Sequence, residues 1–176
     1  MNDRSWNEAT QTREVRDGAG TRGIEVCFGA DVPPDKALFA LWDLDNFPRL
    51  FPDVREAREV SRGEDTMDVA FRVDAVLKEV RYTLRRELLR AEREIRWHNL
   101  TGDLRKVSGA WKIEPGASPS CCRLTYRTFV DVGFFVPTVM IQKLARQKVG
   151  EMVTRVRRVL GELCARGLTP SKPDRP

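Results

Sequence analysis

The sequence predicts an α+β domain, in which a curved antiparallel sheet of about seven strands lies against one long C-terminal helix. Two observations support this class. Segments in which apolar and polar residues alternate follow one another from residue 54 to residue 130, which is typical of strands. After residue 137, apolar residues recur at helical spacing for about 30 residues, which is typical of an amphipathic helix.

The beginning of the domain combines one strand with two short helical segments. A strand is predicted at residues 24–28, where apolar and polar side chains alternate. Pro33 and Pro34 can open a helix but cannot continue one, so a helix is expected after them, with an apolar face that ends near Trp42. Residues 45–52 are aromatic and hold two prolines, and we expect a short helical turn there.

Further strands are expected wherever the alternation returns between short polar turns. They cover residues 54–60, 67–73, 95–97, 107–113 and 124–130.

The stretch 75–91 is ambiguous. Val76, Val80, Leu84 and Leu88 are spaced by four, which fits one face of a helix and also every second inward position of a strand. The residues themselves leave both possibilities open.

The last element is predicted to be a helix about 45 Å long, at 1.5 Å per residue over about 30 residues. Pro137 lies where it would begin, because the first turn of a helix does not need the proline N–H. One helix cannot cover the whole concave side of such a sheet. A cavity between helix and sheet is therefore expected.

The two ends of the chain are polar and aperiodic. We expect disordered tails at 1–20 and 167–176, which leaves one domain at 21–166 of the 176 residues. The net charge of +5 has two interpretations. It favours an anionic partner, such as nucleic acid, a ribosome or an acidic membrane surface, or it only keeps the protein soluble.

Several function classes are disfavoured by composition. No apolar run reaches the roughly 20 residues needed to span a bilayer, and the first residues lack the apolar centre of a signal peptide. The four cysteines show no paired metal spacing and there is one histidine, so no metal or other cofactor is expected. We expect the cysteines to be reduced, which indicates the cytoplasm.

Two groups of residues carry a resemblance. Residues 32–39 (VPPDKALF) with 42–48 (WDLDNFP) form one group, and residues 109–115 (GAWKIEP) with 124–126 form the other. In this order they resemble the START-like helix-grip superfamily, specifically its polyketide cyclase/dehydrase and coenzyme Q-binding (SRPBCC) group. The resemblance implies a helix-grip fold and two strands over residues 75–91.

The resemblance also implies function. It favours binding or carriage of a hydrophobic small molecule, such as a lipid, an isoprenoid quinone or a polyketide-like compound, between sheet and helix. An enzyme of the cyclase/dehydrase type is the alternative, and a ribosome- or RNA-interacting protein is a second one. No Ser-His-Asp, Cys-His or paired-carboxylate arrangement emerges from the sequence, so no catalytic residue is assigned.

The alternation of side chains along each strand predicts which residues line the expected cavity, because alternate residues of a strand share a face. The expected ligand-binding residues are Met67, Val69, Phe71, Val73, Tyr82, Leu84, Arg86, Trp97, Asn99, Trp111, Tyr126, Thr128, Met140 and Leu144. Arg86 either meets an oxygen atom of the ligand or, as we prefer, lies near the strand end and reaches water. His98 is expected on the outer surface.

An apolar run before the last helix also has two interpretations. It is either the core-packed start of the helix or a gate that touches a bilayer, with basic side chains at the lipid headgroups. The gate residues would be Phe134, Phe135, Val136, Lys143 and Arg146. In the second case the protein is peripheral to the inner membrane face.

Overall fold

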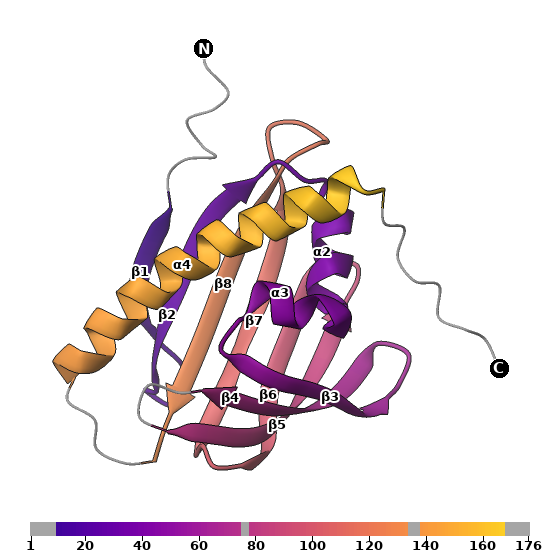
Figure 1. Ribbon diagram of the computed structural model, residues 1–176. Coiled ribbons are helices and arrows are strands. Elements are labelled where there is room, and N and C mark those ends of the chain that lie inside the picture. Colours follow the sequence, from indigo (N-terminus) through magenta and orange to yellow (C-terminus); the bar gives the residue numbers. More distant parts are fainter. Residues whose placement is uncertain (1–9, 75–77, 134–137, 168–176) are drawn as a thin grey trace.

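The fold is an eight-stranded antiparallel sheet with its helices on the concave side (Figure 1). The computed structural model describes residues 10–74, 78–133 and 138–167, and for 138–147 it describes the backbone alone. The strand order is β1-β2-β8-β7-β6-β5-β4-β3. This arrangement confirms the predicted α+β helix-grip class.

From β2 onward the elements follow the predicted order. They are β1 (Gln11–Arg16), β2 (Arg22–Ala30), α2 (Pro34–Trp42), the 3-10 helix η1 (Leu44–Asn46), α3 (Phe47–Leu50), β3 (Val54–Arg62), β4 (Thr66–Asp74), β5 (Glu79–Leu89), β6 (Glu94–Gly102), β7 (Lys106–Pro115), β8 (Cys122–Asp131) and α4 (Thr138–Ala165).

Strand β1 corrects the prediction of a disordered segment up to residue 20. It pairs antiparallel with β2 along its whole length, from Gln11 opposite Cys27 to Arg16 opposite Arg22. Almost all of its side chains are exposed, so it lacks the alternating apolar pattern that reveals a strand in a sequence. The other predicted tail segments, 1–9 and 168–176, lie outside the described residues.

A buried carboxylate holds β1 to the sheet. Glu25 of β2 is only 6 % exposed and accepts hydrogen bonds from Arg13 of β1 and Arg127 of β8. Burial raises the pKa of this carboxyl group, but the two guanidinium groups outweigh it, so the pKa lies below its ordinary value. The charge of Glu25 therefore joins three neighbouring strands.

The ambiguous stretch is a strand. Glu79–Leu89 pairs with β4 without a register shift, from Asp74 opposite Glu79 to Thr66 opposite Glu87. This confirms a strand and not a helix, but the described part of the stretch holds one strand and not the two that the resemblance implies. Residues 75–77, where the turn was expected, lie outside the described residues. Three of the four apolar residues spaced by four, Val80, Leu84 and Leu88, occupy buried positions of the strand.

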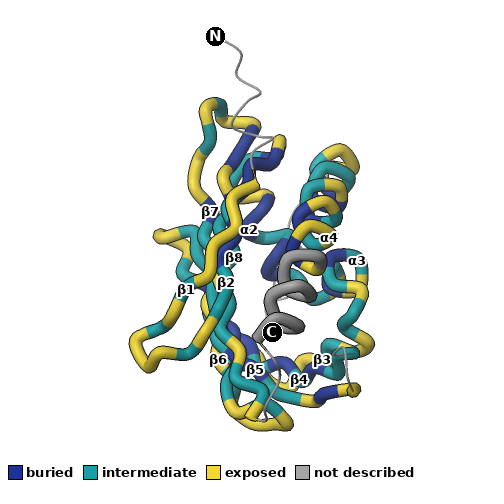
Figure 2. The backbone as a smooth tube through the Cα atoms, turned by 90° about the vertical axis from the view of Figure 1, so that its left-hand side faces the viewer, coloured by how far each residue is buried: buried dark blue, intermediate teal, exposed yellow. Residues whose placement is uncertain are grey.

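Helix α4 crosses the concave face diagonally (Figures 1 and 2). Its described side chains at Val149, Val153, Val156 and Leu160 are buried against the sheet and α2–α3. Arg157 donates to the carbonyl of Gly29 at 2.8 Å, which attaches the helix to β2.

A cavity beneath the C-terminal helix

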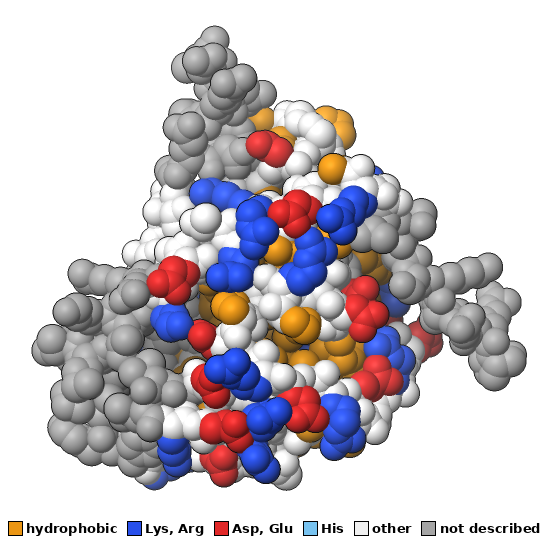
Figure 3. All heavy atoms as spheres, in the orientation of Figure 1, with side chains coloured by type: hydrophobic (Ala, Val, Ile, Leu, Met, Phe, Trp, Pro, Cys, Tyr) orange, Lys and Arg blue, Asp and Glu red, His pale blue; other side chains and the backbone are white. Residues whose placement is uncertain are grey.

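The concave face holds a partly open cavity of about 360 Å³ between the sheet, the α3–β3 segment and α4. Figure 3 shows apolar atoms below α4, framed by intermixed basic and acidic side chains. The described lining residues are Ile24, Phe47, Leu50, Phe51, Pro52, Asp53, Val54, Phe71, Val73, Tyr82, Leu84, Arg86, Trp97, Leu104, Val107, Trp111, Tyr126, Thr128, Val130, Lys148, Val149, Glu151, Met152 and Arg155. A mostly apolar lining with a few polar groups is typical of small-molecule sites.

One side of the cavity is a continuous row of rings, which we call the Phe47 wall: Phe47, Phe51, Phe71 and Tyr82. Its ring centroids are 5.1 Å apart between Phe47 and Phe51, 5.6 Å between Phe47 and Phe71, and 5.7 Å between Phe71 and Tyr82. The row begins on α3 and continues over β4 and β5. It therefore ties the short helix to the sheet.

The other aromatic row, the Trp97 wall, consists of Trp97, Trp111 and Tyr126 on β6–β8. The rings of Trp97 and Tyr126 are stacked with centroids 5.7 Å apart, and Trp111 lies 4.7 Å from Tyr126. Gly109 on β7 makes room for this stack, because a Cβ atom there would lie 2.5 Å from the ring of Trp97. Both walls line the same cavity. The Phe47 wall comes from the α3 segment, β4 and β5, and the Trp97 wall comes from β6, β7 and β8.

Arg86 is the buried charge of the cavity wall. It is 3 % exposed, and its guanidinium donates to the carbonyls of Trp42 at 2.9 Å and Leu41 at 2.7 Å. Its Cζ atom lies 4.8 Å from the ring centroids of both Trp42 and Phe47. Burial lowers the pKa of this guanidinium, which nevertheless stays charged at neutral pH.

The expectation that Arg86 reaches water is therefore wrong. Its partners are free carbonyls at the C-terminal end of α2, where the helix dipole is negative. No described carboxylate lies within ion-pair distance of it. Two aromatic faces and two helix carbonyls thus replace the solvent that a lone buried cation would otherwise require.

Two tyrosines supply neutral hydroxyl groups to the cavity. Burial raises the pKa of Tyr82 and of Tyr126, so both phenols stay protonated at neutral pH. The hydroxyl of Thr128, beside Tyr126 in the lining, donates to the carbonyl of Ser108 at 3.5 Å. The hydroxyl of Tyr82 has no hydrogen-bond partner among the described residues.

The rim of the cavity is charged. Lys148 of α4 pairs with Asp53 of the α3–β3 segment at 2.9 Å, and this contact raises the pKa of Lys148. Glu151 and Arg155 lie on the same side of α4. The pair connects the two elements that border the cavity, while the apolar wall begins below it.

Most residues assigned to the cavity wall from the sequence do line the cavity. These are Phe71, Val73, Tyr82, Leu84, Arg86, Trp97, Trp111, Tyr126 and Thr128. Met67 and Val69 face the same side but are buried in the core beside the cavity. Asn99 accepts a hydrogen bond from the backbone N–H of Val107 at 2.9 Å, which extends the contact between β6 and β7 beyond their last paired residues.

Other assigned residues are not placed by the structure. Phe134, Phe135 and Val136 lie outside the described residues, and at Met140, Lys143, Leu144 and Arg146 only the helix backbone is described. His98 is exposed on β6, as predicted.

Sequence reasoning missed the contribution of α3 and the segment after it. Residues 50–54, together with Phe47, form one side of the cavity. Their signal was the aromatic and proline-rich composition of 45–52, but turn residues have no periodicity from which an inward face can be predicted.

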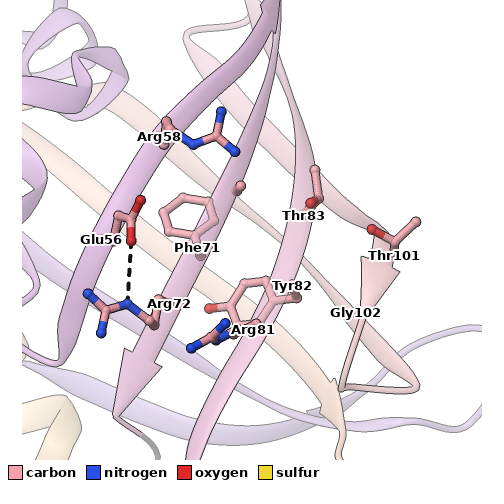
Figure 4. A pocket seen from close by; sticks show the side chains of 10 residues that line it. Glu56, Arg58, Phe71, Arg72, Arg81, Tyr82, Thr83, Thr101 and Gly102 are labelled. Carbon is pink, nitrogen blue, oxygen red and sulfur yellow. Dashed lines mark ion pairs between the residues drawn. The ribbon is translucent and has the colours of Figure 1, made fainter.

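A second depression, of about 450 Å³, lies on the outer face of β3–β6 (Figure 4). Its lining includes the charged side chains of Arg58, Arg72 and Arg81, and also Phe71 and Tyr82, which line the inner cavity as well. Arg72 is paired with Glu56, as Figure 4 shows, and with Glu79. The depression is open, and two of its three arginines, Arg72 and Arg81, are paired with carboxylates. The inner cavity, with its mostly apolar lining, is therefore the candidate site.

The described part of the chain contains no cluster of three or more metal-ligating side chains, and its four cysteines are free thiols. Within the described residues, none of the helices is both long and apolar enough to cross a membrane.

Together, the fold and the cavity define a START-like helix-grip protein. A family model described as polyketide cyclase / dehydrase and lipid transport matches residues 30–157, well over half of the chain. The chain belongs to this family. Comparison with curated proteins finds no match.

Solved structures share the fold at low identity. A START superfamily protein from Mycobacterium smegmatis has a TM-score of 0.70 at 16% identity, over 80% of this chain and 98% of that one. The Zhui aromatase/cyclase from Streptomyces sp. R1128 has a TM-score of 0.65 at 20% identity, over 90% of this chain and 98% of that one. A STAR-related lipid transfer protein from Xanthomonas axonopodis has a TM-score of 0.67 at 15% identity, over 87% of this chain and 94% of that one.

Proposed function

We propose that this protein binds and carries a hydrophobic small molecule in the cavity beneath α4. The observation that carries the proposal is the cavity itself, with about 360 Å³ of space and a lining made mainly of aromatic and aliphatic side chains. Transfer of an apolar ligand into such a site is favourable, at roughly 25 cal/mol per Å² of apolar surface removed from water. The family and the solved relatives, which include a lipid transfer protein, support this function.

Polar groups inside the cavity would orient the ligand. Arg86 keeps N–H groups beyond the two that bond to the end of α2. Tyr82 and Tyr126 add neutral hydroxyls. All three can donate to an oxygen atom of a ligand, which fits an apolar molecule with a few oxygen substituents.

A cyclase or dehydrase acting on a polyketide-like substrate is the second candidate, because both Arg86 and Tyr126 line the cavity. Proton abstraction needs a base within reach of the substrate. The carboxylates of the described lining are Asp53 and Glu151 at the rim, and Asp53 is paired with Lys148. The described interior thus offers hydrogen-bond donors, and its carboxylates lie at the rim. This arrangement favours binding over catalysis.

We further propose that the ligand is exchanged at a membrane surface through residues 134–148, at the inner face of the membrane. Val130, which lines the cavity just before this segment, is 42 % exposed. The net charge of +5 favours an anionic surface. A nucleic-acid or ribosomal partner has less support, because arginines of the outer face such as Arg72 and Arg85 are paired with carboxylates.

Organic extraction of the purified protein followed by mass spectrometry tests the function. We expect one hydrophobic compound in stoichiometric amount with the protein. If the extract is empty and no apolar probe binds the apo protein, the proposal is wrong.

A further inference from the structure

We infer that the outer face of the sheet carries a second site, in which Arg58, Thr83 and Thr101 bind a phosphate group. The site lies in the depression on β3–β6. The inference goes beyond the proposed function and is independent of what the cavity holds. Three features carry it: a row of side chains with a low centre across four strands, the arginines around this row, and three donor groups without partners.

The strand register defines the floor of the depression. Arg58 of β3 lies opposite Ala70 of β4. Ala70 in turn lies opposite Thr83 of β5, which lies opposite Thr101 of β6. Residues directly opposite one another in an antiparallel pair point to the same face. The short side chains of Ala70 and Thr83 therefore leave a hollow in the sheet surface, at the centre of the row.

Longer basic side chains surround this hollow. Residues two apart on a strand share a face and lie about 7 Å apart, so Arg81 and Arg85 flank Thr83 on β5, and Arg72 flanks Ala70 on β4. Arg81 and Arg85 each use Nε and Nη2 for a carboxylate, which leaves other N–H groups of the guanidinium for an anion. The ion pairs of Arg72, at 3.3 and 3.4 Å, are longer than the ~2.7–2.9 Å of strong charge-assisted contacts.

Three donor groups of the row have no hydrogen-bond or ion-pair partner among the described residues: the guanidinium of Arg58 and the hydroxyls of Thr83 and Thr101. Figure 4 shows Arg58 extended from β3 towards β4 and Thr83, whereas Arg72 is directed to Glu56. Arg58 is thus the arginine of the depression that is available to a ligand.

These donors match a phosphate group. A guanidinium binds two oxygen atoms of a phosphate side by side, and a threonine hydroxyl can donate to a third. A carboxylate has only two oxygen atoms, which Arg58 alone would occupy, so the threonines favour phosphate. The group can belong to a soluble phosphorylated compound or to a phospholipid headgroup, because the depression is open to solvent.

Titration of the full-length protein with sodium phosphate, followed in two-dimensional amide NMR spectra, tests the site. Sodium chloride at the same ionic strength controls for screening. We expect phosphate to shift the amide signals of Ala70, Thr83 and Thr101 saturably. The expected Kd is on the order of 1 mM, because contacts between exposed charges are weak.

Two variants test the donors. Arg58→Gln should weaken phosphate binding about tenfold, because hydrogen bonds from a charged donor are lost. Thr83→Val keeps the shape of the side chain and should weaken binding about threefold. Arg123→Gln is the matched control, because Arg123 is an exposed arginine of β8 that lies outside the depression and also has no partner among the described residues. It removes the same charge and should change binding less than about twofold.

Vesicles of phosphatidylcholine with and without phosphatidic acid distinguish the two sources of phosphate. If Arg58→Gln lowers co-sedimentation with phosphatidic acid more than Arg123→Gln does, the ligand is a lipid headgroup. If only the binding of inorganic phosphate depends on Arg58, the ligand is a soluble compound.

Two results would overturn the inference. One is that phosphate shifts these amide signals no more than chloride does. The other is that Arg58→Gln and Arg123→Gln weaken phosphate binding equally. Neither result bears on the ligand of the cavity, so the proposed function is tested separately.

Discussion

Arg86 and Trp42 are joined twice, although they lie far apart in the sequence. The Nη1 group of Arg86 donates to the carbonyl of Trp42 at 2.9 Å, and the guanidinium carbon lies 4.8 Å from the indole ring. A strand residue thereby satisfies the last carbonyls of α2 and packs against the side chain that ends the helix. This link fixes α2 above the wall of the cavity.

Replacing Arg86 with methionine should therefore destabilise the fold. The substitution keeps much of the side-chain volume but leaves two helix carbonyls without their buried donor, which costs about 2–4 kcal/mol. Urea unfolding measures the change. Arg85→Met, on the same strand but at a half-buried position where the guanidinium pairs with Asp68 and not with a helix end, is the matched control and should cost less than the Arg86 substitution. Equal losses for the two variants would show that Arg86 has no special structural role.

A methyl group at Gly109 should disrupt the Trp97 wall. In Gly109→Ala the new Cβ would lie 2.5 Å from the Trp97 ring and 2.2 Å from the carbonyl of Arg127, so the stack must shift. We expect a loss of about 1–3 kcal/mol and a changed near-UV circular dichroism signal.

Gly150→Ala is the control for Gly109→Ala. This helical glycine has nothing within 4 Å of an added Cβ, so alanine there should stabilise the protein by about 0.5–1 kcal/mol. A neutral Gly109→Ala variant would contradict the packing described for Trp97.

Glu25 should make the docking of β1 depend on pH. Its pKa is lower in the folded protein than in the unfolded chain, so its contribution is complete above the unfolded value, near 4.5. The contribution is lost as the pH falls through the lower folded value. Glu25→Gln should therefore be less stable than the wild type at pH 7, and the gap should narrow as the pH falls below ~4.5 and close once it is below the folded pKa of Glu25.

Hydrogen exchange localises this effect. In Glu25→Gln at neutral pH, the amides of β1 should exchange faster while those of β4 and β5 keep their protection. A uniform change over all strands would argue against a local role for Glu25.

The double substitution of Phe134 and Phe135 with aspartate should abolish binding to vesicles that contain anionic lipid. The expectation follows from the apolar run at 132–136 and the basic residues Lys143 and Arg146 after it. Co-sedimentation with liposomes measures it, and Val60→Asp on exposed β3 is the control. Unchanged co-sedimentation of the double variant would exclude the membrane contact through this segment.

Much of the fold could be predicted from the sequence because its periodicities are local. Val69 and Phe71 alternate with polar neighbours, and the apolar residues of α4 recur at helical spacing. Strand β1 could not be predicted, because its stability comes from backbone pairing and from the contact between Arg13 and Glu25, not from apolar alternation.

The candidate site divides in the same way. Strand parity predicted that Tyr82 and Trp97 face inward. The contribution of Phe47 and Phe51 depends on how a short helical turn packs on the sheet, and the partners of Arg86 lie more than forty residues away. Such contacts are set by tertiary packing, which local patterns do not encode.

The central claim is that the cavity beneath α4 holds a hydrophobic molecule. The most direct test is to extract the wild type and Leu84→Trp in parallel and to quantify the bound compounds by mass spectrometry. Leu84 is buried on β5 and lines the cavity, so a larger side chain fills the space, and Val107→Phe repeats the test from β7. We predict a stoichiometric hydrophobic compound in the wild type that is lost from both variants, provided that circular dichroism shows them folded. The same compounds in equal amounts from all three proteins would contradict the claim.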